Sequence, residues 1–201
     1  MTTRVPTEDP KMLVAQAACD LVAEGGLENA TLRKVAARLG TTTGYISHYF
    51  AGKEELLEAA LTAALEEVSG KVARRTASAT LDEWLEMIEQ ALPHDAESQR
   101  FWRVLVAFHA FSLNSSRLQT VLQSYAADGE RRMAEMLETT LPDDVPVEDV
   151  QSLARAVWVL VDGIGTTAVT NPGALSREQQ SVVIRASVDA LIDRTVNRKV
   201  E

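Results

Sequence analysis

The chain has 201 residues and a net charge of -9, with 46% hydrophobic and 24% charged residues. This balance is typical of a globular protein and excludes a disordered chain, a collagen and a membrane bundle. The single cysteine, Cys19, excludes an internal disulfide and a multi-cysteine metal centre.

The first ten residues contain no apolar core of the kind that a signal peptide has. The longest strongly apolar run, 157–161, ends at Asp162 and is far shorter than the roughly 20 residues of a membrane span. We therefore expect a cytoplasmic protein without a membrane segment.

Apolar residues recur at helical spacing along almost the whole chain, and no segment alternates with period two. Gly25 and Gly40 are expected to end the first two helices. Thr80 with Glu83, and Ser176 with Gln179, predict two capping boxes. The fold is predicted to be all-α with about nine helices, near 9–24, 31–39, 42–49, 53–75, 80–92, 97–113, 115–139, 148–170 and 176–195.

The charge is divided unevenly along the chain. Up to Lys53 there are six Lys/Arg against five acidic residues, whereas the remainder holds 14 against 24. Such an asymmetry is compatible with a DNA-binding head on an acidic body. We predict a three-helix helix-turn-helix domain over 1–53 and a helical effector-binding and dimerisation domain over 54–201.

Residues 31–50 predict a helix, a tight turn and a short second helix. Leu32, Val35, Ala36 and Leu39 give the first helix one apolar face, and Gly40 suits the turn. On the second helix Ile46 and Phe50 are expected to face inward at the i,i+4 spacing, while Thr42 or Thr43 caps its start.

The other side of that second helix is polar and lacks carboxylates: it carries Thr43, Tyr45, Ser47, His48 and Tyr49. Such a face suits a DNA major groove, where recognition-helix residues meet base edges. Lys53 begins the next helix and is placed to meet a phosphate. Spacing alone leaves open a second interpretation, in which this is a solvated helical hairpin that binds nothing.

The sequence TTGYISHYF at 42–50, followed by AGKEELL at 51–57, resembles the DNA-binding domain of TetR-family transcriptional regulators and is most similar to the BetI-type branch. The resemblance covers the first helix through about Leu65. It continues more weakly into the body at 101–102, 117–119 and 161–163.

The resemblance implies a role for each matching residue of the head. Arg33 would read a base or a phosphate, Gly44 would let the helix approach the bases closely, and Ser47 would contact the groove. Many relatives have Tyr in place of Ser47, so their operator preference is not transferred. The implied DNA-binding set is Arg33, Thr42, Thr43, Gly44, Tyr45, Ser47, His48, Tyr49 and Lys53.

Aromatic and polar residues interrupt the apolar helices of the body. Trp158 and Asp162 stand four residues apart, and a buried carboxylate is costly unless it is paired or binds a ligand. Aromatic faces with one acid suit a cationic amine or a quaternary ammonium compound. The alternative is that Asp162 is hydrogen-bonded at a subunit contact and the tryptophans only pack. The candidate ligand-binding set is Trp102, Leu105, Val106, His109, Trp158 and Asp162.

The BetI-type resemblance implies an effector pocket in the body, with choline-like ligands in the relatives. Val106 and Gly165 stand where aromatic residues are expected, so a different or larger ligand remains equally open. The resemblance also implies a homodimer formed by the last two helices, which are rich in small residues. His94, beside Pro93 and Asp95, is expected to be exposed.

Enzyme signatures are lacking. The pattern G-x-G-x-x-A at 163–168 follows no predicted strand, and neither a G-x-S-x-G nor an H-E-x-x-H motif occurs. We expect no enzyme activity, cofactor or metal. The leading hypothesis is a repressor that binds a palindromic operator as a homodimer and is released by a small molecule. The alternative is a helical ligand-binding or interaction module without DNA binding, which the overall acidity keeps open.

Overall fold

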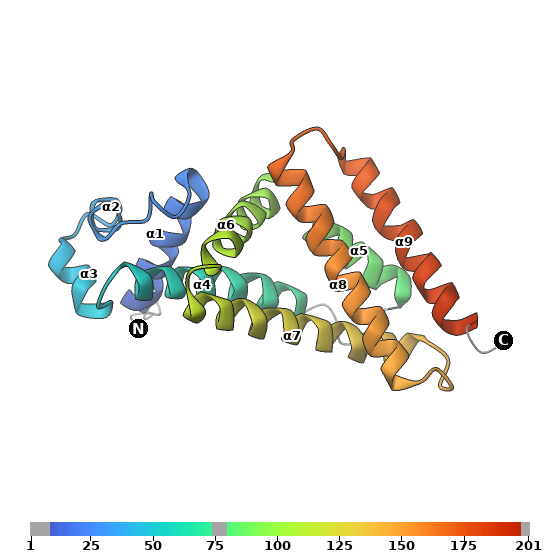
Figure 1. Ribbon diagram of the computed structural model, residues 1–201. Coiled ribbons are helices and arrows are strands. Elements are labelled where there is room, and N and C mark those ends of the chain that lie inside the picture. Colours follow the sequence, from blue (N-terminus) through green and yellow to red (C-terminus); the bar gives the residue numbers. More distant parts are fainter. Residues whose placement is uncertain (1–8, 74–79, 198–201) are drawn as a thin grey trace, which may run out of the picture. The chain divides into compact units, whose positions relative to one another are not determined.

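The computed structural model describes residues 9–73 and 80–197, and within these ranges it contains nine helices and no strand (Figure 1). The all-α prediction is confirmed. The predicted end of the fourth helix at 75 lies outside the described residues. The helices are α1 (Pro10–Gly25), α2 (Leu32–Arg38), α3 (Thr43–Tyr49), α4 (Lys53–Ala73), α5 (Leu81–Ala91), α6 (Ala96–Ser112), α7 (Ser116–Thr140), α8 (Val147–Thr170) and α9 (Arg177–Asn197).

Both predicted capping boxes are present. The Thr80 hydroxyl accepts a hydrogen bond from the Glu83 backbone N–H at 3.3 Å, and the Glu83 carboxylate accepts one from the Thr80 backbone N–H at 2.7 Å. Ser176 and Gln179 exchange the equivalent bonds at 2.8 and 3.2 Å. Each pair satisfies backbone donors that a helix start leaves without a partner, which fixes where α5 and α9 begin.

The chain divides into two compact units by its contacts. Unit 1 comprises residues 1–69 and 103–121, and unit 2 comprises 70–102 and 122–201. The division passes through α4, α6 and α7, so these helices each contribute to both units. The second half of α6 and the start of α7 are thereby grouped with α1, α2 and α3.

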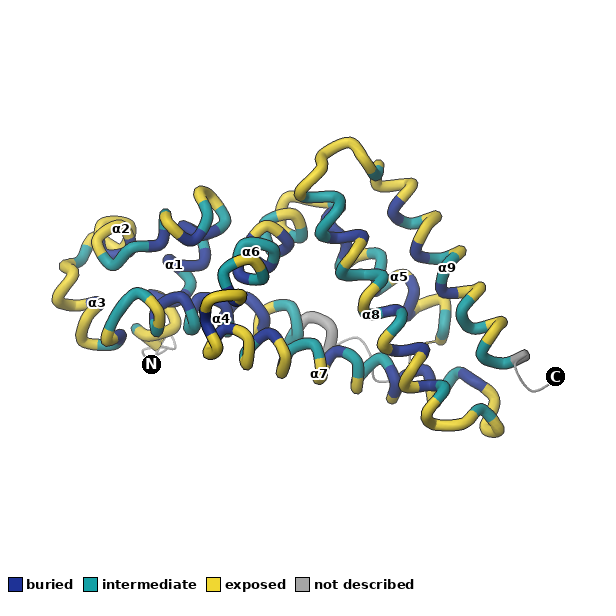
Figure 2. Tube along the Cα trace, viewed as in Figure 1, coloured by how far each residue is buried: buried dark blue, intermediate teal, exposed yellow. Residues whose placement is uncertain are grey.

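Unit 1 has its core around the contacts of α1 with α2 and of α2 with α3. Val14, Val35, Ile46 and Leu61 are fully buried there, as the helical spacing requires. The expected inward face of α2 is only partly correct, because Leu39 lies at the helix end and stays 36% exposed. Figure 2 shows the alternation of buried and exposed residues along these helices.

Unit 2 has a core formed by α5, α7, α8 and α9, in which Trp84, Leu137, Val157 and Ile184 are nearly or fully buried. Helices α8 and α9 pack against each other. The Arg185 guanidinium of α9 donates two hydrogen bonds, at 2.6 and 3.1 Å, to the Glu89 carboxylate of α5. This paired geometry aligns α9 with α5.

Among the described residues, α8 is the one helix that is long and apolar enough to cross a membrane by length and composition. Core helices of soluble proteins pass the same test, and α8 supplies Val150, Leu153 and Val157 to the core of unit 2. Its apolar character is therefore accounted for in part by packing.

Candidate nucleic-acid interface and ligand site

Helix α3 is held by one buried side and leaves the other side open. Its N-cap Thr42 accepts a hydrogen bond from the Tyr45 backbone N–H at 3.2 Å, as the sequence predicts. Ile46 is fully buried and Phe50, just after the helix, is 1% exposed. These two apolar side chains at the i,i+4 spacing fix the rotation of α3 about its axis.

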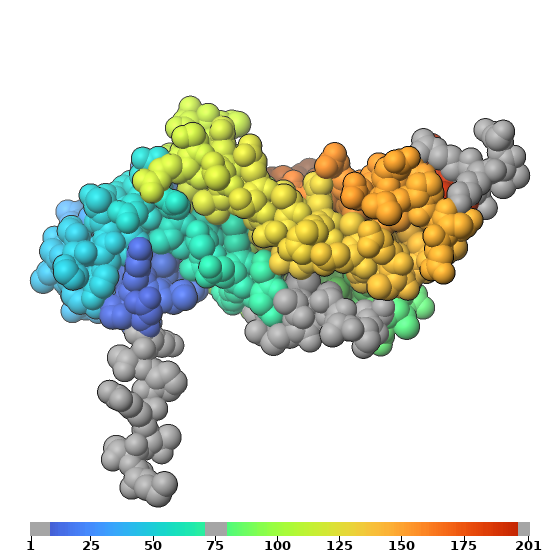
Figure 3. Space-filling view, turned by 90° about the horizontal axis from the view of Figure 1, so that it is seen from below, coloured from blue at the N-terminus to red at the C-terminus, as the bar shows by residue number. Residues whose placement is uncertain are grey.

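The side of α3 opposite Ile46 carries the residues that the sequence predicted to meet DNA. Six of them are exposed, and Tyr49 is partly exposed. In Figure 3 the surface around α3 is coloured light blue to cyan and lies open at the edge of the view. The exposed six are Thr42, Thr43, Gly44, Tyr45, Ser47 and His48.

Three of these side chains form an aromatic cluster. The ring of Tyr49 stands edge-on to Tyr45 at 5.3 Å and to His48 at 5.1 Å between centroids. A hydrogen bond between the two tyrosine side chains raises the pKa of Tyr49. The hydroxyl of Tyr49 therefore stays protonated at neutral pH and can donate a hydrogen bond to a phosphate oxygen.

The basic residues of the head are less free than the sequence indicates. The Arg38 guanidinium binds both carboxylate oxygens of Glu24, at 2.6 and 2.7 Å, and lies 3.8 Å from Asp20. Lys34 donates a hydrogen bond to the Asn29 side chain. Arg33 is exposed and forms no ion pair with any residue that the structure describes. It is the α2 cation best placed for an external anion.

Lys53 begins α4, as predicted, but its ammonium already has a partner. The Nζ atom lies 3.0 Å from a carboxylate oxygen of Glu28, whose side chain is 87% exposed. At the same helix start the Ala51 backbone N–H donates to Glu55 at 2.7 Å. A phosphate at Lys53 would therefore have to compete with Glu28, a residue that the sequence did not single out.

The six predicted ligand-binding residues do not all fall in one unit. Trp102, Trp158 and Asp162 belong to unit 2. Leu105, Val106 and His109 belong to unit 1, where Leu105 is buried and the other two are half-buried. Their joint membership of one site therefore remains a prediction.

Trp102 is a packed side chain. It is 4% exposed, and its indole Nε1–H donates to the Ala91 carbonyl at 2.8 Å. Its ring lies against Gly165 of α8, where an added Cβ would come within 2.3 Å of the indole. Gly165 thus provides the space that the indole occupies, which is the physical reason for a glycine where an aromatic residue was expected.

Trp158 lies in a cluster that joins α7 to α8. Its ring packs on Gly129, where a Cβ would be only 1.9 Å away, and stands edge-on to Tyr125 at 5.3 Å between centroids. Desolvation raises the pKa of Tyr125 to about 12; the positive charge of Arg132 opposes this shift, and the charge of Asp162 acts in the same direction as desolvation. The carboxylate of Asp162 is therefore near this aromatic pair.

Sequence reasoning missed Tyr125. A signal was available, because Tyr125 and Gly129 are four residues apart on α7 and so present an aromatic ring and a gap on the same side of the helix. Tyr125, Trp158 and Asp162 together provide two aromatic rings and one negative charge. Such a combination is suited to a cationic ligand.

His94 differs from the expectation of an exposed side chain. It is half-buried, and its Nε2 is shielded from solvent without a hydrogen bond. Burial lowers the pKa of His94, and the positive charge of Arg177 lowers it further. Within the described ranges no group of three or more His, Cys, Asp and Glu side chains is placed to hold a metal ion.

Comparison with known families gives two matches along the chain. Residues 15–60 match the family described as bacterial regulatory proteins of the tetR family. Residues 80–193 match the family described as BetI-type transcriptional repressor, C-terminal. The second match alone covers more than half of the chain.

Individual relatives and solved structures are similar to this chain over nearly its whole length. The HTH-type transcriptional regulator PksA of Bacillus subtilis is 24% identical over 194 residues, covering 95% of this chain and 94% of the relative. A transcriptional regulator from Rhodococcus sp. Rha1 has a TM-score of 0.83 at 21% identity, covering 94% of this chain and 98% of its own. A regulator from Saccharomonospora viridis in complex with choline has a TM-score of 0.79 at 20% identity, covering 89% and 95%.

Proposed function

The chain belongs to the TetR family of transcriptional regulators and to its BetI-type branch, and from this premise we propose that it is a ligand-responsive repressor. It binds a palindromic operator as a homodimer and releases the DNA when a small molecule binds. Such a repressor acts in the cytoplasm, where operator DNA is accessible. The observation that carries the proposal is the polar, carboxylate-free surface of α3, fixed outward by buried Ile46.

In the proposed complex α3 lies in the major groove. Thr43, Gly44 and Ser47 face the bases, and exposed Arg33 reads a base or a phosphate from α2. The side chains that contact phosphates or sugars are Tyr45, His48, Tyr49 and Lys53. Thr42 orients the start of α3 and contributes its hydroxyl to the same surface.

The homodimer is proposed to form through α8 and α9. Both helices retain large exposed apolar side chains, with Val159 63% and Val182 61% exposed. Two-fold symmetry then places the two α3 helices in successive major grooves, so that the half-sites are separated by about one helical turn, roughly 34–36 Å.

The effector is proposed to be a cationic amine or a quaternary ammonium compound bound near Tyr125, Trp158 and Asp162. Two rings and one carboxylate provide cation–π attraction and charge. The choline complex of the Saccharomonospora regulator supports this ligand class. Release requires the effector to bind more tightly to a conformation in which the spacing of the two α3 helices does not fit the operator. Shifting the population almost completely from the DNA-binding conformation to this one needs a binding preference of about 5.5 kcal/mol.

The DNA-binding proposal is tested by selecting bound sequences from a random duplex pool with the full chain. We expect a palindromic site whose affinity falls linearly with the logarithm of salt concentration. Lys53→Ala should weaken binding to every duplex, whereas Ser47→Ala should change the preference among selected sites. A chain that selects no sequence and binds no duplex at low salt is instead a ligand-binding module without DNA.

The effector proposal is tested by adding choline to the complex with the selected site. The matched control is 3,3-dimethyl-1-butanol, which has the shape of choline without its charge. Choline, and not the alcohol, is expected to release the DNA, and Asp162→Asn should diminish release while sparing operator affinity. Equal release by both compounds, or an unchanged response of Asp162→Asn, would remove the cationic effector.

A further inference from the structure

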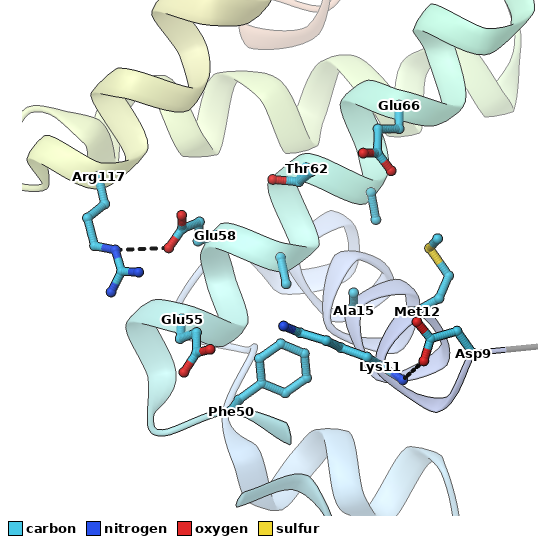
Figure 4. A pocket seen from close by; sticks show the side chains of 12 residues that line it. Asp9, Lys11, Met12, Ala15, Phe50, Glu55, Glu58, Thr62, Glu66 and Arg117 are labelled. Atoms are coloured by element: carbon cyan, nitrogen blue, oxygen red, sulfur yellow. Dashed lines mark hydrogen bonds and ion pairs between the residues drawn. The ribbon is translucent and has the colours of Figure 1, made fainter. Parts of the chain in front are cut away.

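A pocket of about 430 Å³ lies within unit 1, between the start of α1, the ring of Phe50 and one side of α4 (Figure 4). It is separate from the α3 surface and from the cluster around Trp158. Helix α4 lines it with Glu55, Glu58 and Glu66 at helical spacing. The volume lies in the range of small-molecule sites.

The lining combines negative charge with an apolar surface. Four carboxylates, of Asp9 and the three glutamates of α4, outnumber two cations, Lys11 and Arg117. Between them lie Met12, Ala59 and Ala63. A pocket of this kind favours a small organic cation with a short apolar part over an anion or a neutral sugar.

One carboxylate oxygen of the lining lacks a hydrogen-bond donor. The Oε2 atom of Glu58 is shielded from solvent, and none of the residues that the structure describes donates a hydrogen bond to it. Arg117 Nε lies 3.0 Å from this oxygen and forms an ion pair with it (Figure 4). The Glu58 side chain as a whole is 30% exposed, so a ligand N–H can reach its carboxylate group from the pocket beside this ion pair.

The pocket already holds a cation of the chain itself. The Lys11 ammonium lies 5.5 Å from the centroid of the Phe50 ring, and Figure 4 shows its side chain extending over that ring. This distance is within the range of a cation–π interaction. The ring therefore accepts an amine, and Lys11 is an occupant that an external amine would displace or accompany.

We propose that this pocket binds a small amphipathic organic cation with N–H donors, such as an amidinium or a primary alkylammonium. An N–H of the ligand donates to Glu58, and its apolar part lies on Met12 and Ala59. The need for an N–H distinguishes this ligand class from the quaternary ammonium compounds proposed for the Trp158 cluster. Because Phe50 directly follows α3, an occupant of the pocket contacts the support of the recognition helix.

The test measures direct binding by calorimetry without DNA, using three related probes and the full chain with Asp162→Asn, so that the cationic site proposed at the Trp158 cluster does not take up the probes. Benzamidine carries charge and N–H donors, benzamide lacks the charge, and phenyltrimethylammonium lacks the N–H. We expect one benzamidine per pocket and at least tenfold weaker binding of the other two. Binding of phenyltrimethylammonium as tight as that of benzamidine would overturn the proposal.

Variants assign the binding to this pocket. Glu58→Gln should weaken benzamidine binding at least tenfold, Ala59→Phe should fill the space and abolish binding, and Lys11→Ala should strengthen binding by exposing the Phe50 ring. Glu138→Gln, which changes an exposed carboxylate of α7 outside both proposed ligand sites, is the control and should leave the affinity unchanged. If Glu58→Gln does not fold, the opposite effects of Ala59→Phe and Lys11→Ala on the affinity still decide whether benzamidine binds in this pocket. Affinity unchanged in Ala59→Phe, or lost in Glu138→Gln, contradicts the assignment, and neither result bears on operator binding.

Discussion

The cations of the head show how a DNA-binding surface exists within an acidic chain. Arg38 and Lys53 are paired with Glu24 and Glu28, and both pairs are partly open to solvent. Exposed ion pairs of this kind contribute little to folding stability. Their cations therefore remain available to an anion as strongly charged as DNA, although each must first leave its carboxylate.

The pairing of Lys53 leads to a prediction about Glu28. Glu28→Gln should raise the affinity for all duplexes roughly two- to fivefold, because it removes both a competitor for Lys53 and a negative charge that repels phosphate. Fluorescence anisotropy with the operator and with an unrelated duplex measures the effect. Glu28→Gln combined with Lys53→Ala is the control and should lose most of the gain. An affinity that does not change would show that Lys53 contacts no phosphate.

Two aromatic rings in unit 2 pack directly against glycine residues of neighbouring helices. Trp102 packs on Gly165 and Trp158 packs on Gly129, and in both places a Cβ would overlap the ring. These glycines are inside helices, where glycine usually costs roughly 0.5–1 kcal/mol relative to alanine. The packing of each ring against the glycine, which a Cβ would prevent, offsets that cost.

Two glycines of α8 give opposite predictions. Gly165→Ala should lower the free energy of unfolding by about 1–3 kcal/mol, because the new Cβ forces the Trp102 indole out of place. Gly163→Ala, at an exposed site with open space around the Cβ, should raise it by up to about 1 kcal/mol. Chemical denaturation compares the two variants. A Gly165→Ala protein as stable as Gly163→Ala would mean that Trp102 does not occupy this position.

The contact between the α5–α6 connection and α9 predicts a pH dependence. His94 Nε2 is shielded close to Gln180 and Arg177, and burial lowers the pKa of His94 below its ordinary value of 6.5. Stability from the neutral ring is complete above pH 6.5 and is lost as the pH falls through the lowered value, because the unfolded chain takes up the proton more readily. The charges of Glu89 and Asp95 and a hydrogen bond with the Gln180 side chain oppose the shift only in part.

The measurement is unfolding by denaturant between pH 8 and pH 5, with His94→Gln as the comparison. The stability of the natural chain should decline more steeply below pH 6.5 than that of His94→Gln, which cannot take up this proton. Parallel declines in both proteins would show that His94 is accessible and titrates normally.

Sequence patterns predicted the helices better than the sites. Apolar spacing and capping pairs such as Thr80 with Glu83 act over a few residues, so they are readable from the chain. The exposed polar face of α3 followed from Ile46 and Phe50 for the same reason. The pairing of Lys53 with Glu28 and of Trp158 with Gly129 joins residues 25 and more apart in the chain, and no local pattern encodes such contacts.

For the whole molecule, the proposed effector response would use the helices that are shared between the two units. Residues 103–121, the end of α6 and the start of α7, belong to the same unit as the head. There the Ser115 hydroxyl donates to Glu54 at 3.0 Å, and Arg117 pairs with Glu58. Because α6 and α7 continue into unit 2, a ligand that shifts them there would act on α4 through these contacts.

The homodimer gives the last prediction. Combining Val159→Glu with Val182→Glu places charges on the exposed apolar sides of α8 and α9, so the dimer should dissociate while each chain stays folded. Loss of the second head should weaken operator binding roughly 10²–10⁴-fold, since simultaneous engagement of two half-sites supplies that factor. Sedimentation velocity and anisotropy with the selected operator measure both effects. Leu113→Glu, at a 78% exposed apolar site in the α6–α7 turn, is the control and should remain dimeric. A dimer that persists in the double variant places the interface elsewhere, and unchanged operator affinity in a proven monomer would refute binding as a two-fold pair.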